Sequence, residues 1–476
     1  MNLYSENENY KLYKGNMLDM LEVIQPETID SIITDPPYGL TSITKRFGKE
    51  NSAECQYGKD GSFQRLSKGF MGKEWDGSGI EYNVEAWKKC YEVLKPGGYL
   101  LAFGGSRTFH RIACAIEDAG FEIRDTIMWL YGSGFPKSMN VGLKMDKKQG
   151  CPDRGHRIAV ANRHHPDGTL EPNGEVLEPY EAKTDLGKQW QGWGTALKPS
   201  FEPIIVARKP FKGSLVDNVI EYGVGGINID ECRVGTETIS IHNAPKGTFA
   251  GGEYNRGSDT ESYRESQGRF PANTILTYDE TDFDEVCGGF PNTKGDSRTS
   301  KPTYDKSIWG NAKSVESKCL YNDSGSASRY FYCAKASKKD RDEGLDEFED
   351  KEYILGCNGA TLDNIREKGH YGNGGNGLSS IKIRKNTHPT VKPTELMQYL
   401  IRLVTPNNGT ILDCFNGSGS TGKAVMYENY ERNKNYKYIG IELTEEYLPI
   451  SKARIEYVCN LEPEINPQMS IFDMEV

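Results

Sequence analysis

The sequence predicts an α/β protein built on a mostly parallel sheet, and two strand-and-turn units at opposite ends of the chain are the main observations. The first is the apolar, β-branched run Ile29-Asp30-Ser31-Ile32-Ile33-Thr34, which predicts a buried strand and leads into Asp35-Pro36-Pro37-Tyr38. The second is Gly409-Thr410-Ile411-Leu412, which leads into the loop Asp413-Cys414-Phe415-Asn416-Gly417-Ser418-Gly419-Ser420-Thr421-Gly422. Residues 421–426 have helix-forming character, and a further strand over residues 438–441 ends at Glu442.

The tetrapeptide after the first strand carries acceptors suited to an amino group on a base. Its two prolines exclude a helix, and Pro37 holds Pro36 extended. The Asp35 carboxylate and a proline carbonyl can each accept one N–H of an exocyclic amine. That pairing would free a lone pair otherwise delocalised into the ring. Tyr38 offers a face on which an extruded base could stack, offsetting part of the few kcal/mol that base flipping costs. The alternative is a strand-end turn with a buried tyrosine.

The glycine loop has the spacing of a nucleotide-binding turn. Gly417, Gly419 and Gly422 follow the G-x-G-x-x-G pattern between a strand and a helix, which is the context the pattern requires. Glycines allow close approach to a ligand, and the helix N-terminus adds partial positive charge. Glu442, at the end of the next strand, is placed to hold ribose hydroxyls. A dinucleotide is the alternative ligand, whereas a nucleoside triphosphate is disfavoured because no Gly-Lys-Ser/Thr is present.

Together these motifs resemble those of the DNA adenine methyltransferases that use S-adenosyl-L-methionine. Further matching segments are Lys11-Leu12-Tyr13-Lys14-Gly15-Asn16-Met17-Leu18, Val93-Leu94-Lys95-Pro96-Gly97-Gly98-Tyr99-Leu100 and His388-Pro389-Thr390-Val391-Lys392-Pro393. The order of the segments, with the catalytic motif first and the glycine loop last, resembles the β class, a circular permutation of the common methyltransferase sheet. The resemblance implies a Rossmann-like seven-stranded sheet with helices on both faces. Expected strands are residues 11–15, 29–34, 99–103, 122–130, 202–209, 409–412 and 438–441.

The resemblance also implies roles for individual residues. Asp35, Pro36, Pro37 and Tyr38 would form the catalytic amine site. The residues expected to bind the cofactor are Asn16, Lys392, Asp413, Phe415, Gly417, Gly419 and Glu442. Within that set Glu442 would hold the ribose and Lys392 would face the cofactor's carboxylate. Asn16 departs from the family, which often has Asp there to contact the cofactor's adenine amine, and it can still accept through its side-chain oxygen.

The reaction implied is direct methyl transfer to adenine N6 in duplex DNA by base flipping, without a covalent enzyme intermediate. Cytosine N4 is the alternative target, although family members acting on cytosine more often carry Ser in place of Asp35. Two other classes stay open: methylation of RNA or a protein glutamine by a related enzyme, and a non-catalytic DNA-binding protein that keeps the fold. The large recognition region and the intact motifs favour a DNA methyltransferase over both.

The chain divides into four expected parts. Residues 1–210 form the catalytic half, 211–385 a target recognition domain rich in Gly, Ser, Asn and Tyr, 386–460 the cofactor-binding half, and 461–476 a tail. Residues 1–10 are expected to be frayed. Residues 39–76 are expected to form a lid that closes over the flipped base or the DNA backbone, with plain disorder as the alternative. Aromatic residues of the recognition domain could contact bases, although most are expected to pack: Tyr304, Trp309, Tyr321, Tyr330, Phe331 and Tyr332.

The tail suggests a protein partner besides DNA. Gln468-Met469-Ser470-Ile471-Phe472 resembles the pentapeptide that binds the bacterial replication sliding clamp. The alternative is a strand or cap packed on its own domain. A homodimer is also left open by the sequence.

Net charge, cysteine content and hydrophobic runs further restrict the kind of protein that we expect. The net charge of −10 argues against a protein that coats DNA nonspecifically, but not against a locally basic cleft. Candidate basic clusters are Lys45-Arg46, Lys335 with Lys338, Lys339 and Arg341, and Lys382 with Arg384 and Lys385. The 11 cysteines lack a C-x-x-C pair and are expected to be free thiols. We expect no signal peptide, no membrane span and no metal, including at the histidines of the 137–200 insert, and hence a cytoplasmic, nucleoid-associated protein of a bacterium or phage.

Overall fold

The structure is a computed structural model. It describes residues 2–38, 79–131, 138–151, 162–164, 170–172, 180–242, 263–278, 292–293, 296–299, 318–321, 325–326, 331–335, 338–355 and 380–461. The expected lid over residues 39–76, the pentapeptide at residues 468–472 and the Lys45-Arg46 cluster lie outside these ranges. The predictions made for them are therefore not addressed by the structure.

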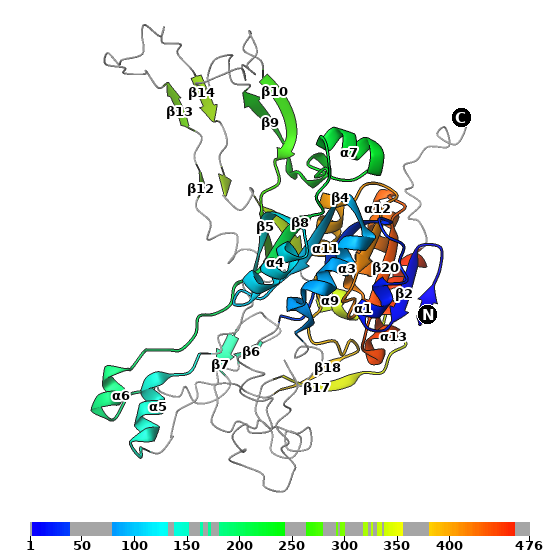
Figure 1. The fold of residues 1–476 in the computed structure, drawn as a ribbon. Coiled ribbons are helices and arrows are strands. Elements are labelled where there is room, and N and C mark those ends of the chain that lie inside the picture. Colours follow the sequence, from blue (N-terminus) through cyan, green and yellow to red (C-terminus); the bar gives the residue numbers. More distant parts are fainter. Residues whose placement is uncertain are drawn as a thin grey trace.

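A ten-stranded sheet forms the centre of the protein, in the order β1-β2-β20-β19-β3-β4-β8-β5-β11-β16 (Figure 1). The strands are β1 (Leu3–Glu6), β2 (Tyr10–Lys14), β3 (Ile29–Thr34), β4 (Leu94–Phe103), β5 (Glu122–Tyr131), β8 (Phe201–Arg208), β11 (Thr274–Tyr278), β16 (Tyr332–Lys335), β19 (Thr410–Asp413) and β20 (Lys437–Glu442). Most neighbours are parallel, but β1 is antiparallel to β2, and β8 is antiparallel to both β4 and β5. The predicted α/β class is confirmed, and all seven expected strands are present.

Helices cover both faces of the sheet. The helices that the structure describes are α1 (Met17–Leu21), α3 (Val84–Val93), α4 (Phe109–Asp118), α5 (Val141–Lys148), α6 (Asp185–Gln189), α7 (Leu215–Tyr222), α9 (Lys338–Asp342), α11 (Thr394–Val404), α12 (Ser420–Arg432) and α13 (Leu448–Cys459), with 3-10 turns η3 (Ile80–Tyr82), η4 (Asp230–Cys232) and η6 (Glu445–Tyr447). Side chains of α1, α3 and α4 pack in one core with Ile32 and Leu100, and those of α11, α12 and α13 pack in another with Ile33 and Leu101. Consecutive strand residues thus enter opposite cores, as the two-residue repeat of a strand requires.

The permuted chain order brings the two motifs together. β19, from the C-terminal part, lies between β20 and β3 and pairs in parallel with both. The chain leaves β3 toward α3 on one face of the sheet and leaves β19 toward α12 on the other. Adjacent parallel strands whose connections leave on opposite faces form a topological switch point, where ligands bind at the carboxyl ends.

The expectation that residues 1–10 are frayed is wrong. β1 pairs with β2 from Leu3↔Tyr13 to Glu6↔Lys11. Asn7 closes the hairpin because its Oδ1 accepts from the backbone N–H groups of Asn9 and Tyr10 at 2.8 and 2.9 Å. A local side-chain turn therefore orders a segment whose composition is polar.

Parts of the expected recognition region, residues 211–385, belong to the central sheet. β11 pairs in parallel with β5 and β16 pairs with β11, so that two strands extend the expected seven at this edge. Tyr332 of β16 stacks on Tyr399 of α11 with ring centroids 4.0 Å apart, which confirms a packing role for this aromatic residue. The side chains of Tyr304, Trp309, Tyr321 and Tyr330 lie outside the described residues.

The remaining described strands form two-stranded pairs outside this sheet. They are β6 (Asn162–His164) with β7 (Leu170–Pro172), β9 (Val234–His242) with β10 (Tyr263–Arg269), β12 (Asn292–Thr293) with β15 (Gly325–Ser326), β13 (Asp296–Thr299) with β14 (Lys318–Tyr321), and β17 (Lys351–Leu355) with β18 (Ser380–Arg384). In Figure 1 the β9–β10 hairpin and the packed α5–α6 pair project away from the sheet in different directions.

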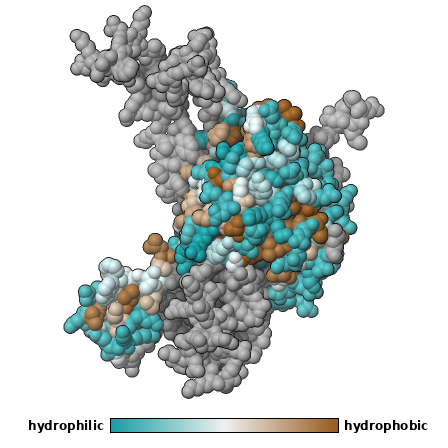
Figure 2. Space-filling model, viewed as in Figure 1, coloured by the Kyte–Doolittle hydropathy of each residue, from teal (hydrophilic) through white to brown (hydrophobic). Residues whose placement is uncertain are grey.

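The surface is mixed, and exposed apolar residues include a group on α7. Figure 2 shows brown, apolar residues gathered there, and Val216 and Ile220 are 67% and 80% exposed. No helix among the described residues has the length and apolarity needed to cross a bilayer. Cys90, Cys114, Cys151, Cys232, Cys414 and Cys459 are free thiols, and the buried sulfur of Cys414 lies 3.6 Å from that of Cys90.

Candidate active site

Asp35 lies at the carboxyl end of β3 with one carboxyl oxygen engaged and one left over. Its Oδ2 is 2.5 Å from the ammonium nitrogen of Lys392. Its Oδ1 is buried and has no hydrogen-bond partner in the described part of the chain. A buried acceptor without a donor costs about 1–3 kcal/mol. Asp35 therefore presents an acceptor that a ligand N–H would satisfy.

Tyr38 is anchored at its backbone and at its hydroxyl. The backbone carbonyl accepts from Thr108 Oγ1 at 2.7 Å and from the Tyr82 hydroxyl at 3.2 Å. The Tyr38 hydroxyl donates to Glu202 Oε2 at 2.7 Å, and it accepts from Lys392 Nζ at 3.2 Å. The orientation of the ring is consequently set by the residues around it.

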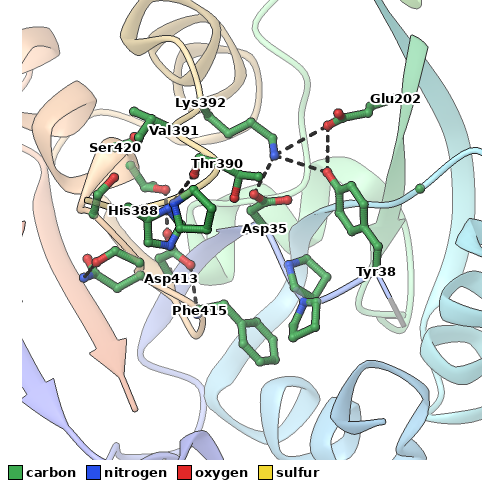
Figure 3. Close-up of a pocket in the computed structure, with 18 of the residues that line it drawn as sticks. Asp35, Tyr38, Glu202, His388, Thr390, Val391, Lys392, Asp413, Phe415 and Ser420 are labelled. Atoms are coloured by element: carbon green, nitrogen blue, oxygen red, sulfur yellow. Dashed lines mark hydrogen bonds and ion pairs between the residues drawn. The ribbon is translucent and has the colours of Figure 1, made fainter. Parts of the chain in front are cut away.

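Lys392 joins the tetrapeptide to strand β8 (Figure 3). Its side chain is 8% exposed, and its ammonium lies 3.5 Å from Glu202 Oε2 as well as against Asp35. The rings of Tyr38, Phe103 and Trp129 surround it, with centroids 5.4, 4.9 and 5.9 Å from Nζ. One ammonium is thus shared by two carboxylates within an aromatic enclosure.

The charges of this cluster are perturbed by burial. Burial raises the pKa of Asp35, and the negative charge of Glu202 adds to that rise while Lys392 opposes it. Burial disfavours the charge on Lys392, but Asp35 and Glu202 together outweigh it and raise the lysine pKa. Burial likewise raises the pKa of the Tyr38 hydroxyl, which stays protonated.

Asp413 connects this cluster to the glycine loop. Its Oδ1 accepts from Thr34 Oγ1 at 2.6 Å and from the backbone N–H of Phe415 at 3.0 Å. Its Oδ2 accepts from Thr421 Oγ1 at 2.6 Å. Burial raises the pKa of Asp413 to about 6 despite these donors. The last residue of β3 and the first turn of α12 are therefore held by one carboxyl group.

Two glycines of the loop adopt positive φ angles, and neighbouring side chains leave no room for a Cβ atom at either position. At Gly417, φ is +53° and an added Cβ would lie 2.9 Å from His388 Nε2. At Gly419, φ is +75° and an added Cβ would lie 2.5 Å from Ser451 Oγ. The loop is thus packed between the segment before α11 and helix α13.

Glu442 and Asn16 already make contacts to the backbone. Glu442 Oε2 accepts from Gly417 N–H at 2.6 Å and Oε1 accepts from Thr444 N–H at 2.7 Å. Burial raises the pKa of Glu442 to about 7. Asn16 caps α1, with Oδ1 accepting from Leu18 N–H at 3.0 Å, so the oxygen expected to contact a cofactor already has one donor.

The segment before α11 is locked to the rest of the fold. His388 is buried, and its Nδ1–H donates to the Thr390 carbonyl at 2.7 Å. Burial lowers the pKa of His388 to about 3, so that the ring is neutral. Arg341 donates to the His388 carbonyl, and Lys385 Nζ donates to the Asp346 carbonyl at 2.8 Å, so these two cations of the candidate basic clusters bind within the protein.

A cavity of roughly 1440 Å³ unites the two motifs. The sequence-predicted residues that line it are Asn16, Asp35, Pro36, Pro37, Tyr38, Lys392, Asp413, Phe415, Gly417 and Glu442. Gly419 is not among the lining residues because it faces Ser451. Lys392 lines the cavity with its ammonium at Asp35, and its expected contact with a cofactor carboxylate stays a prediction. No group of three or more potential metal ligands occurs among the described residues.

Glu202, Thr34 and Thr421 were missed as site residues. Glu202 lies near the start of β8, and only the antiparallel direction of this strand brings its first residues to the edge where β3 and β4 end. The sequence contained no signal for that direction. Thr34 could have been identified because it is the last strand residue before Asp35.

Comparisons with known proteins identify a family and several relatives of this chain. A family model described as "DNA methylase", the N6_N4_Mtase family, matches residues 29–453. The chain is 28% identical to the Type II methyltransferase M.HindIII of Haemophilus influenzae over 236 residues, which is 46% of this chain and 64% of the relative. It is 28% identical to the Type II methyltransferase M.HpaI of Haemophilus parainfluenzae over 137 residues, 29% of this chain and 36% of the relative. The chain thus matches less than two thirds of either relative.

Solved structures show only a loose overall likeness. The PvuII DNA methyltransferase (cytosine-N4-specific) gives a TM-score of 0.36 at 12% identity, covering 98% of this chain and 92% of that one. The complex of M1.HpyAVI with SAM gives a TM-score of 0.33 at 14% identity, covering 95% and 100%. Since the family model spans most of the chain, including both motifs, this chain belongs to the N6_N4_Mtase family of DNA methylases.

Proposed function

We propose that this protein is a site-specific DNA methyltransferase that transfers a methyl group from S-adenosyl-L-methionine to N6 of adenine in duplex DNA. The observation that carries the proposal is the buried Oδ1 of Asp35, which has no hydrogen-bond partner among the residues that the structure describes. It lies in the cavity shared with the glycine loop, and Thr34 and Asp413 tie the two motifs together.

The cavity suits a cationic nucleoside cofactor. Asp35, Asp413 and Glu442 all line it, and each carries a carboxyl group that attracts a cation when it is ionised. A sulfonium cation would be attracted there, whereas the pyrophosphate of a dinucleotide would be repelled. The volume exceeds the roughly 300–1,000 Å³ of a single small-ligand pocket, which leaves room for a cofactor and a flipped base together.

The protein residues would act by binding and orienting the amine. Asp35 Oδ1 and the carbonyl of Pro36 would each accept one N–H and so free the nitrogen lone pair. Tyr38, held by Glu202 and Lys392, would support the extruded base. S-adenosyl-L-methionine supplies an activated methyl group on sulfur. The amine proton released after transfer would pass to Asp35, whose Oδ1 would already accept that N–H.

Adenine is preferred over cytosine because the first residue of the tetrapeptide is an aspartate. The family includes enzymes of both kinds, so cytosine N4 is the second candidate target. A DNA substrate also implies a location with the nucleoid in the cytoplasm. Residues 211–385 would supply target recognition, chiefly through the strand pairs outside the central sheet.

The test is expression in a bacterial host that lacks DNA methylation, followed by single-molecule sequencing of its DNA. Wild type, Asp35→Ala and the exposed-site control Asp118→Ala are compared. Modified adenine in one short motif, present with wild type and the control but absent with Asp35→Ala, is the expected result. Modified cytosine in place of modified adenine would favour the second candidate target, cytosine N4. Unmodified DNA from the wild type, with cofactor binding demonstrated, would refute the proposal.

A further inference from the structure

Glu202 is the one carboxylate of the cluster that no motif accounts for. It lies in β8, on the opposite side of Lys392 from Asp35, and its side chain is 21% exposed (Figure 3). Both of its oxygens are engaged: Oε2 accepts from the Tyr38 hydroxyl at 2.7 Å, and Oε1 accepts from the Tyr131 hydroxyl at 3.4 Å. Glu202 therefore contacts the tetrapeptide without belonging to it.

The contacts give Glu202 two separable effects on the tetrapeptide. The first is geometric, because its hydrogen bond to the Tyr38 hydroxyl fixes the ring on which a base would stack. The second is electrostatic, because it competes with Asp35 for the single ammonium of Lys392. Two carboxylates sharing one buried cation leave a net negative charge beside the amine site.

We propose that Glu202 is a positioning residue for methyl transfer, orienting Tyr38 through its hydroxyl and holding Lys392 between two carboxylates so that Asp35 keeps an oxygen for the substrate amine. This inference rests on the proposed function. Without Glu202 the ammonium would have Asp35 as its only carboxylate partner among the described residues. Asp35 would then be more strongly neutralised and a weaker acceptor.

The electrostatic part has a defined sign. The groups that face Asp35 are Lys392, Glu202, Tyr38 and Asp413. Glu202 is a negative charge that raises the pKa of Asp35. Removing that charge lowers the Asp35 pKa, so the acidic limb of the rate–pH profile should move to lower pH. A residue that merely supports packing would not move it.

The experiment compares Glu202→Gln and Glu202→Ala with wild type on a duplex carrying the target motif. Glu202→Gln keeps an acceptor for the Tyr38 hydroxyl but removes the charge, whereas Glu202→Ala removes both. The control is Glu122→Gln, at the far end of the paired strand, where the carboxylate binds Arg208 at 2.9 Å. We expect Glu202→Ala to lower kcat about 10-fold to 100-fold and Glu202→Gln to lower it less. The cofactor Kd should be unchanged in both variants.

Two further readouts distinguish positioning from a general loss of structure. Glu202→Gln should shift the acidic limb of kcat to lower pH. Tyr38→Phe combined with Glu202→Ala should be non-additive in kcat, because both remove the same hydrogen bond. Wild-type kcat and pH profile in both Glu202 variants would overturn the inference while leaving the function intact. An inactive wild type would instead count against the proposed function itself.

Discussion

The glycine loop and the tetrapeptide lie side by side, yet they differ in how their polar groups are satisfied. Asp413 accepts from three donors, and Glu442 accepts from two backbone N–H groups. Asn416, inside the loop, is held by Tyr438 and Ser451. Around Asp35, by contrast, one oxygen is unpartnered in the described part of the chain and one ammonium serves two carboxylates. The difference indicates that the cofactor side is preformed, whereas the amine side is completed by its substrate.

The largest effect is expected from Asp35→Ala. Loss of the acceptor should lower methyl transfer roughly 10²-fold to 10⁴-fold, the range for removing a positioned proton acceptor. Cofactor affinity should stay within about threefold of wild type, a difference of roughly 0.7 kcal/mol. Transfer is measured with labelled cofactor and affinity by calorimetry. An equal loss of methyl transfer and of cofactor affinity would contradict the distinction between the tetrapeptide and the glycine loop.

The second effect concerns the preformed side. Gly417→Ala should weaken cofactor binding about tenfold to a hundredfold, because the Cβ would lie 2.9 Å from His388 and overpacking costs about 1–3 kcal/mol. Gly223→Ala is the matched control, since φ there is +74° but nothing lies within 4 Å of the added Cβ. The control should lose stability without losing affinity. Equal affinity in the two variants would show that the contact with His388 does not matter for cofactor binding.

The buried carboxyl of Asp413 should make stability depend on pH. Its pKa is raised from 3.8 to about 6, so the folded state binds the proton more tightly than the unfolded chain. This stabilisation is fully present below about pH 4 and is lost as pH rises through 6. Its upper bound is about 3 kcal/mol at 1.36 kcal/mol per pKa unit.

Thermal unfolding between pH 4 and pH 8 measures this contribution. Because Asn cannot titrate, the unfolding free energy of Asp413→Asn should fall less than that of wild type as the pH rises from 4 to 8. Glu442, with a pKa raised to about 7, retains part of the dependence in both proteins. The same pH slope in variant and wild type would mean that Asp413 is already ionised in the folded state.

The smallest effect is expected at the hydrogen bond between Thr34 and Asp413, which connects the tetrapeptide to the glycine loop. Thr34→Val removes the hydroxyl that binds Asp413 and should cost about 1–2 kcal/mol of unfolding free energy with a several-fold loss of kcat. Ser31→Ala is the control on the same strand, where the hydroxyl is 2.8 Å from Thr405 Oγ1 instead. It should cost similar stability with kcat unchanged. Chemical denaturation and initial rates test this, and equal kcat in the two variants would separate Thr34 from the reaction.

Much of the fold could be predicted from the sequence because its strands are marked by apolar, β-branched runs. The seven expected strands are present, and the adjacency of β3 and β19 follows from the permuted order. β1 was missed because it is polar and depends on the local turn at Asn7. β11 and β16 were missed because their parallel partners are distant in sequence, so no local pattern indicates them.

The site was predicted where it follows motifs and missed where it depends on strand direction. Nine of the predicted residues besides Asn16 line the cavity, whereas Glu202 reaches it only because β8 runs antiparallel. The position of Lys392 at Asp35 is a consequence of how the segment before α11 packs beside the carboxyl end of β3. Contacts between side chains from distant segments depend on the three-dimensional arrangement, and the spacing of residues along the sequence does not predict them.

The most direct test of two adjacent but separable sites is a cofactor titration of initial methylation rates in Asp35→Ala and Gly417→Ala. The account predicts that Asp35→Ala lowers kcat at every cofactor concentration with a wild-type KM for the cofactor. It predicts that Gly417→Ala raises that KM and approaches wild-type kcat at saturation. Wild-type kcat in Asp35→Ala, or a KM raised equally in both variants, would contradict it.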